Sequence, residues 1–262
     1  MPQPSSRLVL ILNPILHPLM PKLAVQLYSL RRETEKNPEE VLLQLPGIGF
    51  EAVELAGDYG WSADKWKEVL AKSGLKVMGA HVHLDDIEAK FNELVAFHRS
   101  IGNPRLIVPW LEEKWYSLEG FREIARRLHA LAPRVHDAGL SLHYHNHDFE
   151  FRKLSDGSIG FDILLKNTDP ALVGFEVDTY WIEKSGYEAL AFLRKHESRV
   201  SIVHAKEFQR AEQKDCAAGK GDINFKEIVP LAVKNDWPIV VECEGENAIE
   251  IVRESAQYLS KL

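Results

Sequence analysis

The sequence predicts a single-domain α/β protein of the (β/α)8 class, the TIM barrel. Short apolar runs rich in β-branched residues alternate eight times with stretches of helical spacing. The runs centre near residues 26, 53, 78, 107, 142, 176, 202 and 240. One unit therefore takes about 31 residues, the size of a strand, a helix and their turns. The chain has 262 residues, which suits one barrel and is too short for two large domains.

The eight predicted strands are apolar segments bounded by polar turns. They cover residues 23–28, 51–55, 75–82, 105–110, 140–145, 172–178, 200–205 and 238–244. An open, doubly wound sheet also alternates strands and helices, but no G-x-G-x-x-G follows the first strand here. No stretch rich in Pro, Gly and Ser divides the chain, which predicts one domain over residues 20–262.

Four of the connecting segments carry clear helical signals. Pro38 stands at the first position of one predicted helix, where its missing N–H costs nothing. Residues 118–139 place four apolar side chains on one stripe, with Gly139 as the stop; these are Phe121, Ile124, Leu128 and Leu131. Residues 225–235 and 247–262 have the same helical spacing.

Charge and cysteine content narrow the classes of function. The chain carries 32 Lys and Arg against 39 Asp and Glu, a net charge of −7 that disfavours nucleic-acid binding. No run reaches the ~18 apolar residues of a membrane span. Cys216 and Cys243 are too few for a disulfide framework, so free thiols in a reducing cytoplasm are expected.

Residues 1–19 stand apart from the predicted barrel. Their apolar run is interrupted by Pro14 and Pro18, and no small-residue cleavage site follows, so a signal peptide is disfavoured. Met20 directly precedes the first strand. We therefore expect residues 1–19 to be a disordered extension or the result of a start codon assigned too far upstream.

Polar side chains gather near the carboxyl ends of the predicted strands. Residues two apart in a strand share a face, and the faces in question carry Gln26, Glu54, His81, His83, His143, His145, Glu176, Asp178, His204, Lys206, Glu242 and Glu244. The fourth strand is the exception, since it ends at Pro109 and Trp110. Buried charges must be paired or must bind a cation, and barrel sites lie at this end of the strands. We expect one divalent metal of the Mn, Mg, Co or Zn kind.

The fifth strand and the residues that follow it carry the densest of these signals, which includes YHNHDFEF at residues 144–151. His143, His145 and His147 would share one face if the strand continued. Polar residues also line solvated strand ends without chemistry, but the later strands supply matching acidic and imidazole partners.

With these motifs the sequence resembles the xylose-isomerase-like TIM barrels, the sugar phosphate isomerases/epimerases, over residues 22–262. The resemblance rests on YHNHDFEF and FEVDTYW, and less specifically on AVQLYSLR, GFEAVELAG, VHAKEF, GKGDINF and VVECE. It implies one divalent metal, Mn²⁺ foremost with Zn²⁺, Mg²⁺ or Co²⁺ as alternatives. The ligands carried over from the family are Glu150, Asp178, His204 and Glu242.

The ligand from the fifth strand is open between two residues. Several branches of the family place a Glu immediately before an Asn, where this chain has His145 before Asn146. Either His145 binds the metal with Glu150 in support, or Glu150 binds it and His145 is free to act as a base. The carboxylate-rich habit of the family favours Glu150. Glu207 departs from the Asp that is usual after the Lys, and we expect this change to cost little.

The resemblance implies isomerisation or epimerisation of a sugar, a sugar phosphate or another keto-sugar. A metal would polarise the carbonyl and stabilise the enediolate that forms when a neighbouring C–H proton leaves. The expected catalytic residues are His145, Glu150, Glu242 and Lys206. Glu54, His81, His147, Trp181 and Glu244 are expected to contact substrate.

Three alternatives share this fold. A lyase or hydrolase of 3-keto-glycosides would use the same proton abstraction to expel an aglycone. A metal-dependent phosphodiesterase like the apurinic endonucleases needs a basic surface that the net charge does not supply. A non-catalytic sugar-binding barrel would show damaged ligand positions. GKGDINF is able to hold an anion on its backbone N–H groups, and homo-oligomers are common in the family.

Overall fold

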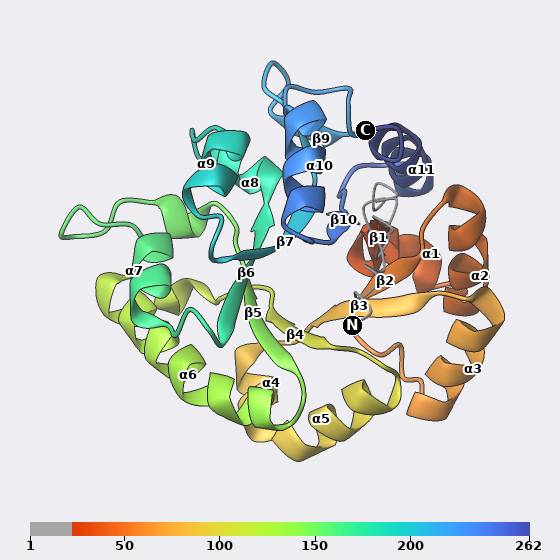
Figure 1. Cartoon of the computed structure of the whole chain (residues 1–262), viewed down its shortest axis with the longest axis horizontal. Helices are drawn as coiled ribbons and strands as arrows, with labels where there is room; N and C mark the ends of the chain where they lie inside the picture. The colour runs from red at the N-terminus through yellow and green to blue at the C-terminus, as the bar shows by residue number, and fades with distance from the viewer. Residues whose placement is uncertain (1–22) are drawn as a thin grey trace, which may run out of the picture.

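Eight parallel strands form a closed barrel in the computed structural model, which describes residues 23–262 (Figure 1). The strands are β1 (Leu23–Gln26), β2 (Ala52–Ala56), β3 (Lys76–His81), β4 (Arg105–Val108), β5 (Ser141–His145), β6 (Val173–Asp178), β7 (Val200–Ala205) and β10 (Ile239–Val241). They lie in sequence order around the barrel, and β10 closes it against β1. The predicted (β/α)8 fold is confirmed.

Helices surround this barrel and connect its strands (Figure 1). They are η1 (Leu27–Leu30), α1 (Arg31–Thr34), α2 (Pro38–Ile48), α3 (Ala63–Ser73), α4 (Leu84–Ala89), α5 (Phe91–Ser100), η2 (Glu113–Trp115), α6 (Leu118–Asp137), η3 (Phe149–Phe151), α7 (Gly160–Asn167), α8 (Thr179–Lys184), α9 (Ala189–Lys195), α10 (Phe225–Lys234) and α11 (Ala248–Leu259). The predicted start at Pro38 is confirmed, and Asn37 caps that helix by accepting from Glu40 N.

The barrel interior is apolar toward the amino ends of the strands. One small buried cluster fills it there: Ala24, Ala52, Met78, Ile107, Ile202 and Val240. The larger hydrophobic core lies between the strands and the surrounding helices. The strand register pairs Gln26 with Glu54, and Asp178 with His204. Alternation along each strand thus brings the polar strand-end residues together above this apolar cluster.

Some features differ from the predicted ones or lie outside the description. The fifth strand ends at His145, so His147 does not continue its face. A two-stranded hairpin of β8 (Glu207–Gln209) and β9 (Lys214–Cys216) follows the seventh barrel strand and was not predicted. The expected extension over residues 1–19 falls outside the described residues. Between residues 23 and 262, no helix has both the length and the apolarity to cross a membrane.

Gly120 fixes the approach of η2 to the first turn of α6. A Cβ added to Gly120 would lie 2.3 Å from the carbonyl oxygen of Trp115 and 2.9 Å from its Cα. The Gly120 N–H donates to Ser117 Oγ at 3.0 Å, which caps the helix. Since the obstructing atoms belong to backbone, a side chain here would have to move the whole turn.

Gly120→Ala is therefore expected to lower the free energy of unfolding by about 1–3 kcal/mol through overpacking. The same exchange inside an unobstructed helix raises it by about 1 kcal/mol. Gly47→Ala is the matched control, because Gly47 is exposed in α2 and an added Cβ meets nothing within 4 Å. Urea unfolding of both variants measures the difference, and a stabilised Gly120→Ala protein would contradict this account.

Candidate metal centre

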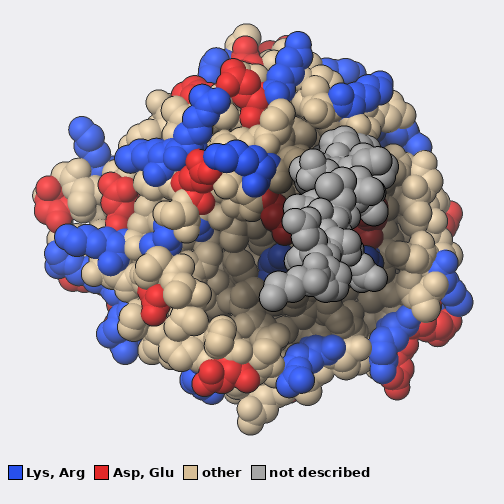
Figure 2. Space-filling view, viewed as in Figure 1, with Lys and Arg blue, Asp and Glu red and all other residues tan. Residues whose placement is uncertain are grey.

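Four side chains from neighbouring strand ends converge at the mouth of the barrel. His145 ends β5, Asp178 ends β6, His204 lies near the end of β7, and Glu242 follows β10. All four are buried, and each offers a ligand atom that lies within 4.8 Å of the others. Figure 2 shows a hollow in the centre of the viewed face, with acidic and basic atoms visible inside it. Two imidazoles and two carboxylates in this arrangement can hold a divalent metal ion.

The chemistry of Asp178 fits a cation at this position. Its Oδ1 accepts from Trp181 N at 3.1 Å, whereas Oδ2 is buried and lacks a hydrogen-bond partner in the described part of the chain. Burial raises the pKa of Asp178 to about 7, because the charged form has lost its water. A metal bound to Oδ2 would satisfy this atom and stabilise the carboxylate.

Glu150, the ligand favoured by the sequence, lies outside this group. Its Oε1 accepts from Tyr144 Oη at 2.7 Å, and its Oε2 accepts from His147 N at 2.9 Å. Tyr144 alternates with His145 along β5, so Glu150 interacts with the opposite face of the strand. Burial raises the pKa of Glu150 to about 8. The geometry places His145 with the other three residues and favours the alternative in which Glu150 supports the loop.

A layer of buried charges lies beside the four candidate ligands. Glu176 Oε2 accepts hydrogen bonds from two imidazoles, those of His81 at 2.8 Å and His145 at 2.9 Å, and it forms an ion pair with His204 Nε2 at 3.0 Å. These four residues also form a second group with metal-ligating geometry. The sequence placed Glu176 on the polar strand face but did not select it as a site residue. Glu176 lies two residues before Asp178, and this spacing in a strand indicates that the two side chains point to the same face.

Glu54 belongs to the same layer and not to the exposed mouth. Its Oε2 accepts from His204 Nε2 at 2.8 Å and from Gln26 Nε2 at 2.6 Å. Burial opposes the charged form of His204, but the carboxylates of Glu176 and Glu54 outweigh it and hold its pKa well above the usual value. A metal bound through one of these nitrogens would displace its proton. Glu54 thus contacts and positions histidines, and its predicted contact with substrate stays a prediction.

Lys206 is a buried cation beside the candidate ligands. Its Nζ donates to Glu242 Oε1 at 3.1 Å and to Glu244 Oε1 at 2.5 Å. Burial opposes its charge, but Glu242, Asp178 and Glu244 outweigh this effect and raise its pKa. The ammonium lies 4.8 Å from the Trp181 ring centroid. Lys206 therefore supplies a fixed positive charge next to the site.

Buried polar atoms around the site that have no hydrogen-bond partner among residues 23–262 include, besides Asp178 Oδ2, the atoms Asn146 Nδ2, His147 Nδ1 and Trp181 Nε1. The His147 ring lies 5.1 Å from that of Trp181 and 5.0 Å from that of His145. Buried polar atoms normally find partners. Unpaired atoms of this kind beside a candidate metal centre are suited to bind a ligand.

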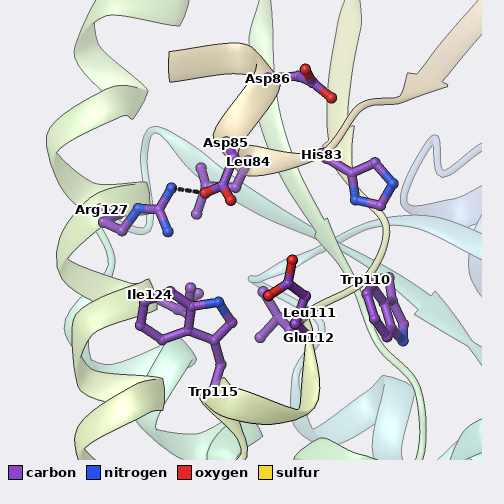
Figure 3. A pocket seen from close by; sticks show the side chains of 10 residues that line it. All are labelled: His83, Leu84, Asp85, Asp86, Trp110, Leu111, Glu112, Trp115, Ile124 and Arg127. Atoms are coloured by element: carbon purple, nitrogen blue, oxygen red, sulfur yellow. Dashed lines mark hydrogen bonds and ion pairs between the residues drawn. The ribbon is translucent and has the colours of Figure 1, made fainter. Parts of the chain in front are cut away.

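His143 and His83, two other strand-end histidines, are not part of this group. His143 lies between Ser141 Oγ at 2.8 Å and Ser201 Oγ at 2.7 Å, and burial lowers its pKa to about 3. It is a neutral, satisfied packing residue. His83 occupies the position before α4 without making a side-chain capping hydrogen bond, and it lines a separate cavity (Figure 3).

The GKGDINF loop does bind an anion on its backbone, but the anion belongs to the chain itself. Glu207 Oε1 accepts from Ile223 N at 3.0 Å and from Phe208 N at 2.9 Å. Its Oε2 accepts from Gly219 N at 2.9 Å. Gly221 leaves room for this carboxylate, since an added Cβ would lie 2.6 Å from Glu207 Oε1. The Glu at this position therefore has a structural role that the sequence did not reveal.

The closed barrel and the His, Asp and Glu side chains at its mouth define a TIM barrel with a candidate metal centre. The family model of the xylose isomerase-like TIM barrel matches residues 45–262. The chain belongs to this family. The resemblance inferred from the sequence motifs is thereby confirmed.

Similar proteins include enzymes of two kinds. An inosose dehydratase of Lactiplantibacillus plantarum is 23% identical over 271 residues, covering 87% of this chain and 89% of that protein. Inosose dehydratase 2 of Bacillus cereus is 33% identical over 160 residues, covering 53% of this chain and 50% of that protein. A solved sugar phosphate isomerase/epimerase from Parabacteroides distasonis superposes with a TM-score of 0.81 at 23% identity, covering 92% of this chain and 98% of that one.

Glu207→Gln should destabilise the protein, because the new amide N–H₂ cannot accept a backbone hydrogen bond. We expect a loss of about 1–3 kcal/mol in the free energy of unfolding for the N–H left unpaired. Lys220→Ala in the same loop removes an exposed ion pair with Glu254 and is expected to cost less than about 1 kcal/mol. Denaturant unfolding compares the two variants, and equal losses would show that Glu207 does not hold the loop.

Proposed function

We propose that the chain is a divalent-metal-dependent enzyme that acts on a keto-sugar or a keto-polyol. It removes the proton next to the carbonyl and expels the substituent on the following carbon, which is lyase chemistry. The observation that carries this proposal is the convergence of His145, Asp178, His204 and Glu242 at the barrel mouth. The relatives named dehydratases support elimination over isomerisation as the outcome.

In this proposal His145, Asp178, His204 and Glu242 hold the metal, with Mn²⁺ foremost and Zn²⁺, Mg²⁺ or Co²⁺ as alternatives. When bound, the metal supplies a Lewis acid that polarises the carbonyl of the substrate. Glu176 fixes the His145 ring through its Nδ1 at 2.9 Å. This contact orients the imidazole in the manner common to metal-binding histidines.

His147 is the base that we assign in place of His145. Its Nδ1 has no partner within the described chain, and burial holds its pKa well below the usual value, so the ring is neutral. A neutral imidazole beside the site can take the proton from carbon. The C–H electron pair then forms the new double bond, and the leaving group departs with its own bonding pair.

Two cationic side chains can assist the departing oxygen. Lys206 presents a fixed positive charge that stabilises negative charge developing on that oxygen. Burial opposes the charge of His81, but Glu54 and Glu176 outweigh it and raise its pKa to about 10. Its protonated ring can donate the proton that completes the leaving group. Trp181 Nε1, unpaired in the described chain, and Glu244 are assigned to the substrate hydroxyls.

Isomerisation or epimerisation is the second candidate. It needs the same first step and a proton returned to carbon instead of a group expelled. The observation in its favour is that a neutral His147 and a protonated His81 lie in one site, so that protons can be taken and returned from different positions.

The metal prediction separates His145 from Glu150. Loss of a residue that only supports a metal ligand typically weakens metal binding by about 10–100-fold. We expect His145→Ala to weaken metal binding by more than this, because it removes a ligand. Glu150→Gln should keep the metal, because its carboxylate binds Tyr144 and His147. Elemental analysis after equilibrium dialysis against Mn²⁺ measures both. Loss of metal from Glu150→Gln with retention in His145→Ala would reverse the assignment.

The reaction prediction uses a keto-inositol and a 3-keto-glucoside deuterated on the carbon next to the carbonyl. Elimination should transfer this deuterium to solvent as the substituent leaves, and His147→Ala should slow the reaction by about 10²–10⁴-fold. NMR and mass spectrometry follow label and product together. Deuterium exchanged or moved to the neighbouring carbon without loss of a substituent would favour isomerisation. Turnover that retains all label on its original carbon would exclude both.

A further inference from the structure

The hairpin of β8 and β9 is held at the rim of the barrel by contacts with two helices. Phe208 in β8 is buried, and its ring contacts that of Tyr180 in α8 edge-on, with ring centroids 5.2 Å apart. Directly after β9, Ala218 N donates to Ser255 Oγ in α11 at 3.0 Å. The register of the hairpin pairs Asp215 with Phe208. These contacts with α8 and α11 therefore fix the position of Asp215.

Asp215 contacts the segment that follows β10, the last strand of the barrel. Its Oδ2 accepts a hydrogen bond from Glu244 N at 2.5 Å. One residue earlier, Cys243 N donates to Ser29 Oγ at 3.0 Å. At these residues β10 has ended and α11 has not begun, so neither a strand ladder nor a helix binds the two N–H groups. Side chains from distant parts of the chain thus hold this segment, and Asp215 holds it at Glu244.

Glu244 and the candidate ligand Glu242 share the ammonium group of Lys206. The Nζ of Lys206 lies 2.5 Å from Glu244 Oε1 and 3.1 Å from Glu242 Oε1. The other oxygen of Glu242, Oε2, accepts from His204 Nδ1 at 3.0 Å. An ammonium group that bound Glu242 alone would neutralise this carboxylate and compete with a metal ion for it. The contact with Glu244 therefore leaves Glu242 more of its charge.

Glu244 depends on Asp215 for this contact. The side chain of Glu244 is 42% exposed, whereas that of Lys206 is 1% exposed. If its backbone were released, Glu244 could turn toward water, and the buried Lys206 would stay with Glu242. Asp215 belongs to neither group of side chains with metal-ligating geometry. Its influence on the candidate metal centre must therefore pass through Glu244 and Lys206.

We propose that Asp215 is a positioning residue of the metal centre. It holds Glu244 against Lys206, so that the ammonium group is divided between two carboxylates and Glu242 keeps its charge for the metal. The inference rests on the proposed function for the metal itself. The placement of Lys206 by Asp215 does not depend on the metal and is tested separately.

The reaction of Lys206 with acetic anhydride tests its placement in the metal-depleted protein, with mass spectrometry resolving the site. Asp215→Ala should make Lys206 react severalfold faster, because Glu244 no longer holds the ammonium group. Asp215→Asn should react like the wild type, since its amide oxygen can still accept from Glu244 N. Lys214→Ala is the matched control, because Lys214 is exposed in the same strand and pairs with the exposed Glu212.

Binding of Mn²⁺ tests the consequence for the metal centre, by equilibrium dialysis and elemental analysis. Asp215→Ala should bind Mn²⁺ about tenfold more weakly than the wild type, as is typical for loss of a supporting residue. Glu244→Gln should lose affinity similarly, since an amide binds an ammonium group less strongly than a carboxylate does. Asp215→Asn and Lys214→Ala should stay close to the wild type. The double variant Asp215→Ala/Glu244→Gln should bind no more weakly than either single variant, because both act through one contact.

Three results would each overturn the inference: unchanged reactivity of Lys206 in Asp215→Ala, equal effects of Asp215→Ala and Asp215→Asn, or losses of Mn²⁺ affinity that add in the double variant. Additive losses would indicate that Asp215 only stabilises the fold. Failure of the proposed function has a different signature. In that case the wild type binds no Mn²⁺, while the reactivity of Lys206 still depends on Asp215.

Discussion

The site depends on keeping two carboxylates, Glu54 and Glu176, charged in the interior of the barrel. Burial opposes such charges strongly, and here imidazolium groups lie against them. The His204 Nε2 lies within 3.0 Å of an oxygen of each carboxylate. Removing one partner from such an arrangement leaves the other charge uncompensated. The charges of this layer therefore stabilise one another as a unit. Their hydrogen bonds and ion pairs also fix the positions of the side chains above the layer.

Two kinds of residue share the mouth of the barrel as a result. His145 and His204 contact the charged layer and also belong to the candidate metal centre. Asp178 and Lys206 lie beyond the layer, where a buried oxygen without a partner in residues 23–262 and a fixed ammonium are available to a ligand. Parallel strands end at the same level, so this separation follows from strand register and alternation.

The fold was predictable because hydrophobic periodicity and unit length are local properties of a sequence. The same alternation located His145, Asp178, His204 and Glu242 on strand ends. The alternation did not reveal that β5 ends at His145, so that His147 lies in the following loop and not on the strand face. Nor did it reveal that Glu150 accepts a hydrogen bond from Tyr144 on the other side of the strand. These outcomes depend on the path of a loop, and loop paths are set by tertiary contacts that the spacing of residues does not encode.

The carboxylate of Glu207 has a consequence for the entropy of the site. Three backbone N–H groups of residues 208–223 are fixed by a side chain that is always present at high effective concentration. This loop is therefore already ordered before any ligand arrives, and its ordering adds no conformational cost to ligand binding. The sequence GKGDINF, taken alone, suggests that its backbone binds an external phosphate. In this structure the same backbone instead binds Glu207, which holds the loop against the rim of the barrel. Evolution of phosphate recognition at this rim would first require the internal carboxylate to be removed.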